Sequence, residues 1–200
     1  MNKPAETEYP VLDEIKLRWS PRAFADRAVE PEKLRSLFEA ARWAASAFNE
    51  QPWRFIVATR DTPAEYDKAL GCLVEANQAW AKSAPVLVLA VSSSRFQKND
   101  KDNRVALYDL GQAAAHLGIE ATRQGLVVHQ MAGVDLDKVR EAYGVPEGFE
   151  PQTAIAVGYP GEAESLPEGW MRDAEKAARG RNRFDAFVFG DGWGKASGLF

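Results

Sequence analysis

Apolar residues recur at intervals of three and four along much of the chain, a spacing that predicts amphipathic helices. Over residues 31–45 the repeat consists of Leu34, Leu37, Phe38 and Ala41, and Pro31 suits the first helical position. Further helices are predicted from Leu12 and Ile15 to the stop at Pro21, over 63–71 with a resumption through Ala81, over 103–123, and over 135–143. Thr62 and Glu65 have capping-box spacing, and Asp135 is expected to cap the last helix before Gly144 ends it.

Four shorter stretches have the length of β-strands: residues 53–59, 86–91, 126–128 and 152–158. Residues 86–91 are apolar without interruption, which predicts a strand buried on both faces. Helices alternate with these strands, and neither an internal repeat nor a linker divides the chain. The pattern indicates one α/β or α+β domain.

The helix predicted over residues 103–123 is apolar on nearly all sides. Its main stripe is Leu107, Leu110, Ala114, Leu117 and Ala121, and Gly111 and Gly118 allow close backbone approach. This pattern favours burial on several sides, a subunit interface among them. Asp109 lies on the same helix and needs a buried hydrogen-bond or ion-pair partner.

Residues 161–180 are polar with little apolar repeat, but the tail from Phe184 to Trp193 is rich in aromatic residues. So much apolar surface must be buried, either against its own domain or around a partner subunit. Four tryptophans are expected in the core or an interface, namely Trp43, Trp80, Trp170 and Trp193.

Composition excludes several classes of protein. The 200 residues are 46% hydrophobic and 27% charged with a net charge of −4, as in a globular domain without a nucleic-acid or anionic-membrane surface. The N-terminus lacks the apolar core of a signal peptide and residues 84–91 are too short to span a bilayer, so a cytoplasmic protein is expected. The single cysteine, Cys72, excludes an internal disulfide and is expected to fill the core.

The first chemical feature is the stretch Arg18-Trp19-Ser20-Pro21-Arg22, which follows the first predicted helix. Its two arginines flank a hydroxyl, and the guanidinium fork fits a phosphate or another planar acceptor. Taken alone, the stretch is also compatible with a solvated helix end whose cations favour the helix dipole.

Five motifs in order along residues 15–193 resemble the nitroreductase family of flavoproteins. The first is the arginine stretch, which resembles the family's arginine-x-serine-x-arginine opening. The second is Ser46 to Trp53, which resembles its serine-rich turn ending in asparagine-x-glutamine-proline-tryptophan. The other three are residues 108–111, the turn at 131–135 with residues 158–160, and Arg179-Gly180-Arg181. The resemblance implies an α+β fold with a mixed, largely antiparallel sheet flanked by helices. It also implies that residues 1–200 form one FMN-binding domain, with 181–200 as a C-terminal extension that wraps the partner in a homodimer.

The resemblance implies roles for individual residues. Arg18, Arg179 and Arg181 would hold the FMN phosphate with help from Ser20, whereas Arg183 is a third cation of the C-terminal segment, after Arg179 and Arg181, or simply exposed. Arg22 would lie near the pyrimidine edge of the flavin, where a cation favours the reduced ring. Further contacts are expected from Trp19, from Ser46 and Asn49 of the second subunit, from Asn77, and from main-chain donors in the turn Met131-Ala132-Gly133.

Some of these positions have simpler interpretations or depart from the family. Ser46 and Asn49 also suit a turn before a strand, and Gln51, although a candidate cofactor contact, belongs with Pro52 and Trp53 as a residue that shapes the turn. Many members carry glutamate where Ala132 stands, and Ala47 replaces a hydroxyl residue. No metal site is expected: His116 is structural, and His129 at most lines the pocket.

The implied activity is transfer of electrons from NADH or NADPH, by a ping-pong mechanism, to an electron-poor small molecule such as a nitroaromatic or a quinone. No glycine-rich dinucleotide fingerprint is present, which fits a pyridine nucleotide that visits the site. One alternative is a specialised relative, a dehalogenase or a flavin-fragmenting enzyme, although the short loop at 92–103 leaves little room for a lid. The other is a non-catalytic FMN-binding dimer, which the arginines at both ends of the chain disfavour.

Overall fold

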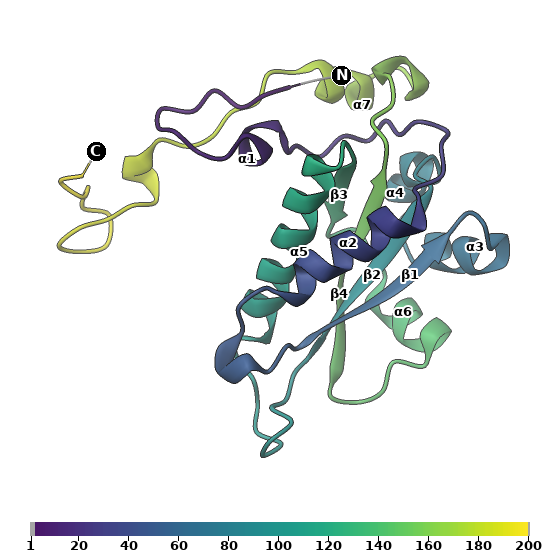
Figure 1. Cartoon of the computed structure of the whole chain (residues 1–200), viewed down its shortest axis with the longest axis horizontal. Helices are drawn as coiled ribbons and strands as arrows, with labels where there is room; N and C mark the ends of the chain where they lie inside the picture. Colours follow the sequence, from purple (N-terminus) through teal and green to yellow (C-terminus); the bar gives the residue numbers. More distant parts are fainter. Residues whose placement is uncertain (1–2, 200) are drawn as a thin grey trace.

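A four-stranded sheet with strand order β1-β2-β4-β3 forms the centre of the molecule in the computed structural model, which describes residues 3–199 (Figure 1). The strands are β1 (Trp53–Thr59), β2 (Val86–Ser93), β3 (Val127–Met131) and β4 (Phe149–Gly158). All three pairings among these strands are antiparallel. The predicted α+β class is confirmed, and the sheet is more uniformly antiparallel than the mixed arrangement expected, because the chain enters β2 at the end where it leaves β1.

Helices cover both faces of this sheet. On one face lie α2 (Pro31–Arg42) and α5 (Ala106–Arg123); on the other lie α3 (Pro63–Gly71), α4 (Glu75–Ala81) and α6 (Leu136–Tyr143). Strand β2 is buried along its whole length. Its Val86 and Val88 pack toward α2 and α5, whereas Leu87 and Leu89 pack toward the opposite layer, so the strand predicted to be buried on both faces is confirmed.

Most predicted elements are present, with shifted ends. Helix α1 (Asp13–Leu17) ends before Pro21, α2 stops at Arg42 rather than residue 45, and β3 is longer than its predicted stretch. The polar residues 161–180 hold a 3₁₀ turn, η2 (Ala163–Ser165), and helix α7 (Trp170–Lys176), which the weak repeat did not predict.

The two predicted helix caps differ in outcome. The Asp135 carboxylate accepts a hydrogen bond from the Lys138 N–H at 3.1 Å and caps α6 as expected. The predicted capping box at Thr62 is wrong: α3 begins at Pro63, but the Thr62 hydroxyl donates to the Thr59 carbonyl at 3.2 Å instead of accepting from the helix. A preceding turn thus competes for the same hydroxyl.

Helix α5 is buried along Leu110, Ala114, Leu117 and Ala121, as predicted. Leu107 is the exception in this stripe, because it is 56% exposed beside Tyr108, which is 72% exposed. Both residues lie on a face that no described element of the protomer covers.

The C-terminal tail runs away from the sheet, past α1, as the yellow segment in Figure 1. It includes the short turn η3 (Phe184–Ala186), and none of its residues from 181 to 199 is buried. Trp193 is 94% exposed, so within one protomer the tail does not fold back on its own core. Of the four tryptophans expected in the core or an interface, Trp80 alone is buried within the protomer. No helix among residues 3–199 has the length and apolar character that crossing a membrane requires.

Candidate functional site

The arginine stretch 18–22 forms an extended loop between α1 and α2 that is fixed at several main-chain positions. The N–H groups of Arg22 and Ala23 both donate to the Glu175 carboxylate, at 3.1 Å and 3.0 Å. The Pro21 carbonyl lies 3.0 Å from His129 Nδ1, and the Ala23 carbonyl accepts from the Gly161 N–H at 2.9 Å. The helix ends at Leu17, where Arg18 adopts an extended conformation, and long-range contacts then hold the loop in one conformation.

Three of the predicted phosphate-binding arginines line one pocket of about 300 Å³. Arg18 comes from the loop after α1, and Arg179 and Arg181 come from the segment after α7. Burial lowers the pKa of the Arg18 guanidinium, and the positive charges of Arg179 and Arg181 lower it further. Arg18 Nη1 also donates to Ser20 Oγ at 3.3 Å. The three guanidinium groups repel one another, and a bound phosphate would offset this repulsion.

Arg179 differs from its neighbours because its donors are already largely engaged. Its Nη1 donates to the carbonyls of Lys3 and Lys16 at 2.6 Å and 2.7 Å, and its Nη2 donates to the Arg18 carbonyl at 2.8 Å. The guanidinium of Arg179 therefore joins the N-terminal segment, α1 and the tail. Arg181 is exposed and hydrogen-bonds only the Gly180 carbonyl within the described chain, whereas Arg183 lies outside the pocket lining and pairs with Asp185 at 3.6 Å.

Arg22 belongs to a second group, the ring-edge cluster, which we define as Arg22, Trp80, His129 and Trp170. The Arg22 guanidinium carbon lies 5.8 Å from the centre of the Trp80 ring and 5.0 Å from that of Trp170. The Arg22 Nε is buried and has no hydrogen-bond partner among the described residues. An unpartnered buried donor of this kind suits an acceptor atom supplied by a ligand.

His129 packs against Trp80, with the two ring centres 4.5 Å apart. Burial, aided by the charge of Arg22, lowers the pKa of His129 to about 4, so the imidazole is neutral at pH 7. Because the partner of Nδ1 is the Pro21 carbonyl, Nδ1 carries the proton and donates it. The histidine therefore supports the arginine loop without adding charge.

The turn at residues 131–133 joins the same cluster through Asn77. Asn77 Nδ2 donates to the Gly133 carbonyl at 2.9 Å, and Asn77 Oδ1 accepts from Trp80 Nε1 at 3.3 Å. A Cβ at Gly133 would lie 2.4 Å from Asn77 Nδ2, so this close approach requires glycine. The Met131 side chain is buried in the core, whereas the Ala132 and Gly133 N–H groups donate to no other described residue.

The serine-rich turn contains the 3₁₀ turn η1 (Ala47–Asn49) and is strained. Phe48, Asn49 and Gln51 have φ angles of 55°, 57° and 51°, a left-handed conformation that non-glycine residues rarely adopt. Ser46 Oγ accepts from the Gln51 N–H at 3.0 Å. The buried Asp109 carboxylate accepts from the Ala47 N–H at 3.0 Å, which confirms the expectation of a buried hydrogen bond for that residue.

One protomer does not bring this turn to the arginine pocket. The turn is tied to Asp109 near the start of α5, whereas the Arg18 side chain lies 3.9 Å from the place where a Cβ of Gly118 would stand. These two positions of α5 are nine residues apart, about 14 Å along the helix axis. Ser46 and the exposed Asn49 are therefore remote from Arg18 in the same chain.

Two further placements refine the sequence predictions. Trp19 is only 9% exposed and its ring lies under the Lys3 ammonium at 4.5 Å, so its side chain is part of the core. His116 Nδ1 lies 3.3 Å from the Ala40 carbonyl of α2, a structural contact. Within residues 3–199 no group of His, Cys, Asp and Glu side chains is arranged to hold a metal ion.

Sequence reasoning did not identify Glu175 and left Trp170 among the possible core residues. Both reach Arg22 across about 150 positions of the chain, from a segment without a strong apolar repeat. The presence of a tryptophan in an otherwise polar segment was the one available signal.

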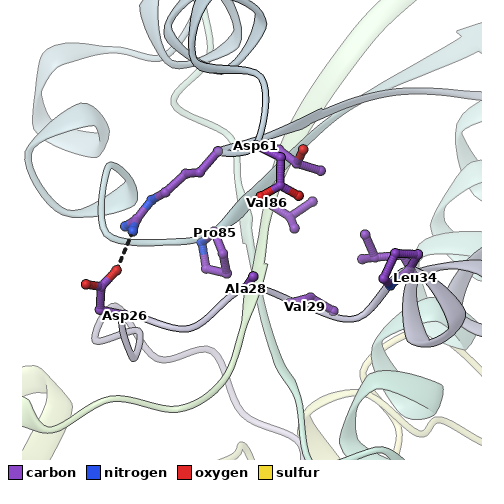
Figure 2. A pocket seen from close by; sticks show the side chains of 10 residues that line it. Asp26, Ala28, Val29, Leu34, Asp61, Pro85 and Val86 are labelled. Carbon is purple, nitrogen blue, oxygen red and sulfur yellow. Dashed lines mark hydrogen bonds and ion pairs between the residues drawn. The ribbon is translucent and has the colours of Figure 1, made fainter.

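A separate cavity of about 400 Å³ lies where the N-terminus of α2 meets the ends of β1 and β2 (Figure 2). Val29, Leu34 and Val86 line its apolar side. At its rim Arg60 pairs with Asp26 at 2.8 Å, drawn as the dashed line in Figure 2. The cavity shares no lining residue with the arginine pocket or the ring-edge cluster, and none of its lining side chains has a buried polar atom without a partner.

Comparison with known proteins agrees with this geometry. A solved structure described as "the oxidoreductase containing FMN" superposes with a TM-score of 0.89 at 31% identity and covers 96% of both chains. A nitroreductase family protein from Clostridium difficile 630 superposes with a TM-score of 0.68 at 25% identity, covering 90% of this chain and 96% of its own.

Among sequence relatives, a protein of Methanothermobacter thermautotrophicus named "Putative NADH dehydrogenase/NAD(P)H nitroreductase" is 30% identical over 156 residues, 76% of this chain and 78% of its own. An uncharacterized 15.4 kDa protein of Mycolicibacterium smegmatis is 32% identical over 147 residues, 70% of this chain and 97% of its own. The family model described as "Nitroreductase family" matches residues 15–159. The chain therefore belongs to the nitroreductase family, a family of oxidoreductases.

Proposed function

We propose that this protein is an FMN-dependent oxidoreductase that passes electrons from NADH or NADPH to an electron-poor small molecule, such as a nitroaromatic or a quinone. One observation carries the proposal: Arg18, Arg179 and Arg181 converge on one pocket from opposite ends of the chain. Family membership and the similarity to an oxidoreductase containing FMN support it.

The residues present fit the chemistry of FMN. Arg18 and Arg181 would hold the doubly charged phosphate and Ser20 would add a neutral hydrogen bond, while Arg179 holds the surrounding backbone with its three carbonyl contacts. The unpartnered Arg22 Nε and the free N–H groups of Ala132 and Gly133 are donors available to the edge of a flavin ring. The cations and donors thus match an anionic tail and a polar ring edge.

Bound FMN supplies the redox chemistry, and the protein supplies position and charge. In this mechanism the Arg22 guanidinium stabilises the negative charge that appears on reduction. The Ala132 and Gly133 N–H groups orient the ring from the turn that Asn77 supports. The pyridine nucleotide and the acceptor use the same face in turn, which gives ping-pong kinetics and needs no acidic or basic side chain at a fixed position.

The complete site requires a homodimer in this proposal. Ser46 and Asn49 would reach the flavin of the second subunit, since they are remote from Arg18 of their own chain. In this proposal the exposed apolar side chains of one protomer are buried in the interface. They are Leu107 and Tyr108 on α5, Trp43 after α2, Phe48, and Phe187 and Trp193 of the tail.

An anaerobic absorption spectrum with NADH or NADPH tests the proposal. We expect a flavin band that bleaches with the nucleotide and returns when a quinone or nitroaromatic is added. Arg18→Ala and Arg181→Ala should weaken FMN binding about 10- to 100-fold, because each loses a charge-assisted hydrogen bond of about 1.5–3 kcal/mol. Arg183→Ala, outside the pocket lining, is the matched control. A colourless protein that does not bind added FMN would refute the flavoenzyme assignment.

A further inference from the structure

Glu175 on α7 is a buried carboxylate, 2% exposed, with no ion-pair partner among the described residues. Burying such a charge is costly unless hydrogen bonds compensate it. Here the compensation comes from two consecutive main-chain donors and from the positive charge of Lys3. The Arg22 N–H lies 3.2 Å and 3.1 Å from the two carboxylate oxygens, and the Ala23 N–H lies 3.0 Å from one of them.

The same helix also contacts the Arg22 side chain. The centre of the Trp170 ring, five residues before Glu175, lies 5.0 Å from the guanidinium carbon, and that of Trp80 lies 5.8 Å from it. Helix α7 therefore fixes both the main chain and the side chain of Arg22. No other described acidic side chain bonds to the Arg22 N–H or forms an ion pair with Arg22.

Helix α7 is itself anchored to the rest of the molecule. Lys3 Nζ donates to the Glu175 carbonyl at 2.7 Å, and Lys176 pairs with Glu164 at 2.6 Å. The Arg172 guanidinium donates to the carbonyls of Glu164 and Leu166 at 3.0 Å and 2.8 Å. These contacts fix the position of α7, and the contacts of α7 with Arg22 and Ala23 then fix the position of the arginine loop.

We propose that Glu175 is a positioning residue that holds Arg22 at the ring edge of the flavin and thereby sets the reduction potential of the bound cofactor. The inference rests on the proposed function, because it takes Arg22 as the cation beside the ring. Coulomb energy falls with distance, so a guanidinium that is free to move away stabilises the reduced ring less. Fixing two successive amides of the loop prevents this movement.

Two substitutions separate position from charge. Glu175→Asp keeps the charge but withdraws the carboxylate from the two N–H groups by one methylene. Glu175→Gln removes the charge but keeps the length and one acceptor oxygen, which can stand where Oε1 now accepts from both N–H groups. Glu175→Asp should lower the midpoint potential of bound FMN by more than half of the shift that Arg22→Ala produces, whereas Glu175→Gln should not lower it by as much. Asp173→Asn, an exposed carboxylate on the same helix, is the matched control and should keep the wild-type potential.

The double variant Glu175→Asp with Arg22→Ala tests whether Glu175 acts through Arg22. It should have the potential of Arg22→Ala alone, whereas a further fall equal to that of the single Asp variant would overturn the proposal. If Glu175 acted only through its charge, Glu175→Gln would raise the potential and Glu175→Asp would leave it unchanged, which would also overturn it.

Trp170→Ala provides a test that alters no charge, because tryptophan is neutral. The residue is also 60% exposed, so its removal leaves no buried cavity. The substitution should lower the potential too, since the guanidinium loses one of its two aromatic contacts, and an unchanged potential would count against the role of α7. FMN-loaded Glu175 variants with wild-type potentials would overturn this inference alone. A wild-type protein that binds no FMN would instead overturn the proposed function and this inference with it.

Discussion

His129 shows how burial fixes the charge of a single residue. Burial lowers its pKa to about 4 in the folded protein, whereas an unfolded histidine has a pKa near 6.5. Between pH 6.5 and pH 4 the unfolded chain therefore binds a proton that the folded chain does not. The free energy of unfolding should be highest above pH 6.5 and should fall by up to roughly 3 kcal/mol as the pH approaches 4.

Urea unfolding at several pH values between 7 and 4.5 measures this dependence. His129→Gln should show a shallower fall than wild type, because it removes the buried titrating ring. His116→Gln, on the exposed side of α5, should retain the wild-type profile. Identical slopes for wild type and His129→Gln would show that His129 does not cause the pH dependence.

Gly133 is fixed by the atoms that surround it. In Gly133→Ala the added methyl would lie 2.4 Å from Asn77 Nδ2 and 2.8 Å from Val74 Cγ2, so the turn or the start of α4 must move. We expect a loss of about 1–3 kcal/mol in the free energy of unfolding and weaker FMN binding. Gly71→Ala is the control, because nothing lies within 4 Å of its Cβ position, and its unfolding free energy should not fall. Equal thermal unfolding of the two variants would contradict the steric argument.

Single residues with strong local requirements were predictable from the sequence. Asp109, an acidic residue in an apolar helix, needed a partner and has one in the Ala47 N–H, and Cys72 fills the core as expected. Glu175 gave no such signal, because acidic residues are ordinary in a polar segment. Its burial depends on the loop at 22–23, more than 150 residues away.

At the scale of elements, hydrophobic spacing was informative wherever one face meets the sheet. The uninterrupted apolar run became β2, and the repeat of Leu34, Leu37 and Ala41 became α2. Spacing failed for Leu107, since a stripe does not show where the covering element ends. It also missed α7, which packs Met171 against the core and is held otherwise by hydrogen bonds and ion pairs.

The tail is an element whose role the protomer alone does not explain. None of the residues from 184 to 199 is buried, so a truncation after Arg183 removes no side chain from the protomer core. In the proposed homodimer the same truncation removes Phe187 and Trp193 from the interface and should shift the protein toward monomer. Sedimentation velocity at several concentrations measures the shift, with Lys195→Ala as a control that keeps the aromatic side chains. A truncated protein that remains as dimeric as wild type would exclude the tail from the interface.

At the scale of the whole molecule, the candidate site combines segments from both ends of the chain and its middle. The sequence alone reached this combination through the family resemblance, because no periodicity predicts that Arg18 and Arg179 line one pocket. The long helix α5 then separates the arginine pocket from the serine-rich turn by about 14 Å within one chain. In the proposed homodimer the two parts that contact one ligand come from different chains.

Subunit complementation tests this arrangement directly. Arg18→Ala removes a phosphate cation, and Asn49→Gly removes a side chain from the turn while allowing the φ of 57° found there. Each homodimer should bind FMN weakly. If every site takes Arg18 from one subunit and Asn49 from the other, random reassociation of an equal mixture should restore about one quarter of the sites, because half of the dimers are mixed and each carries one intact site. Mixing Arg18→Ala with Arg181→Ala, two residues of the same pocket, should restore none. If the first mixture also restored none, each site would draw both residues from one chain, and the proposed interface would be wrong.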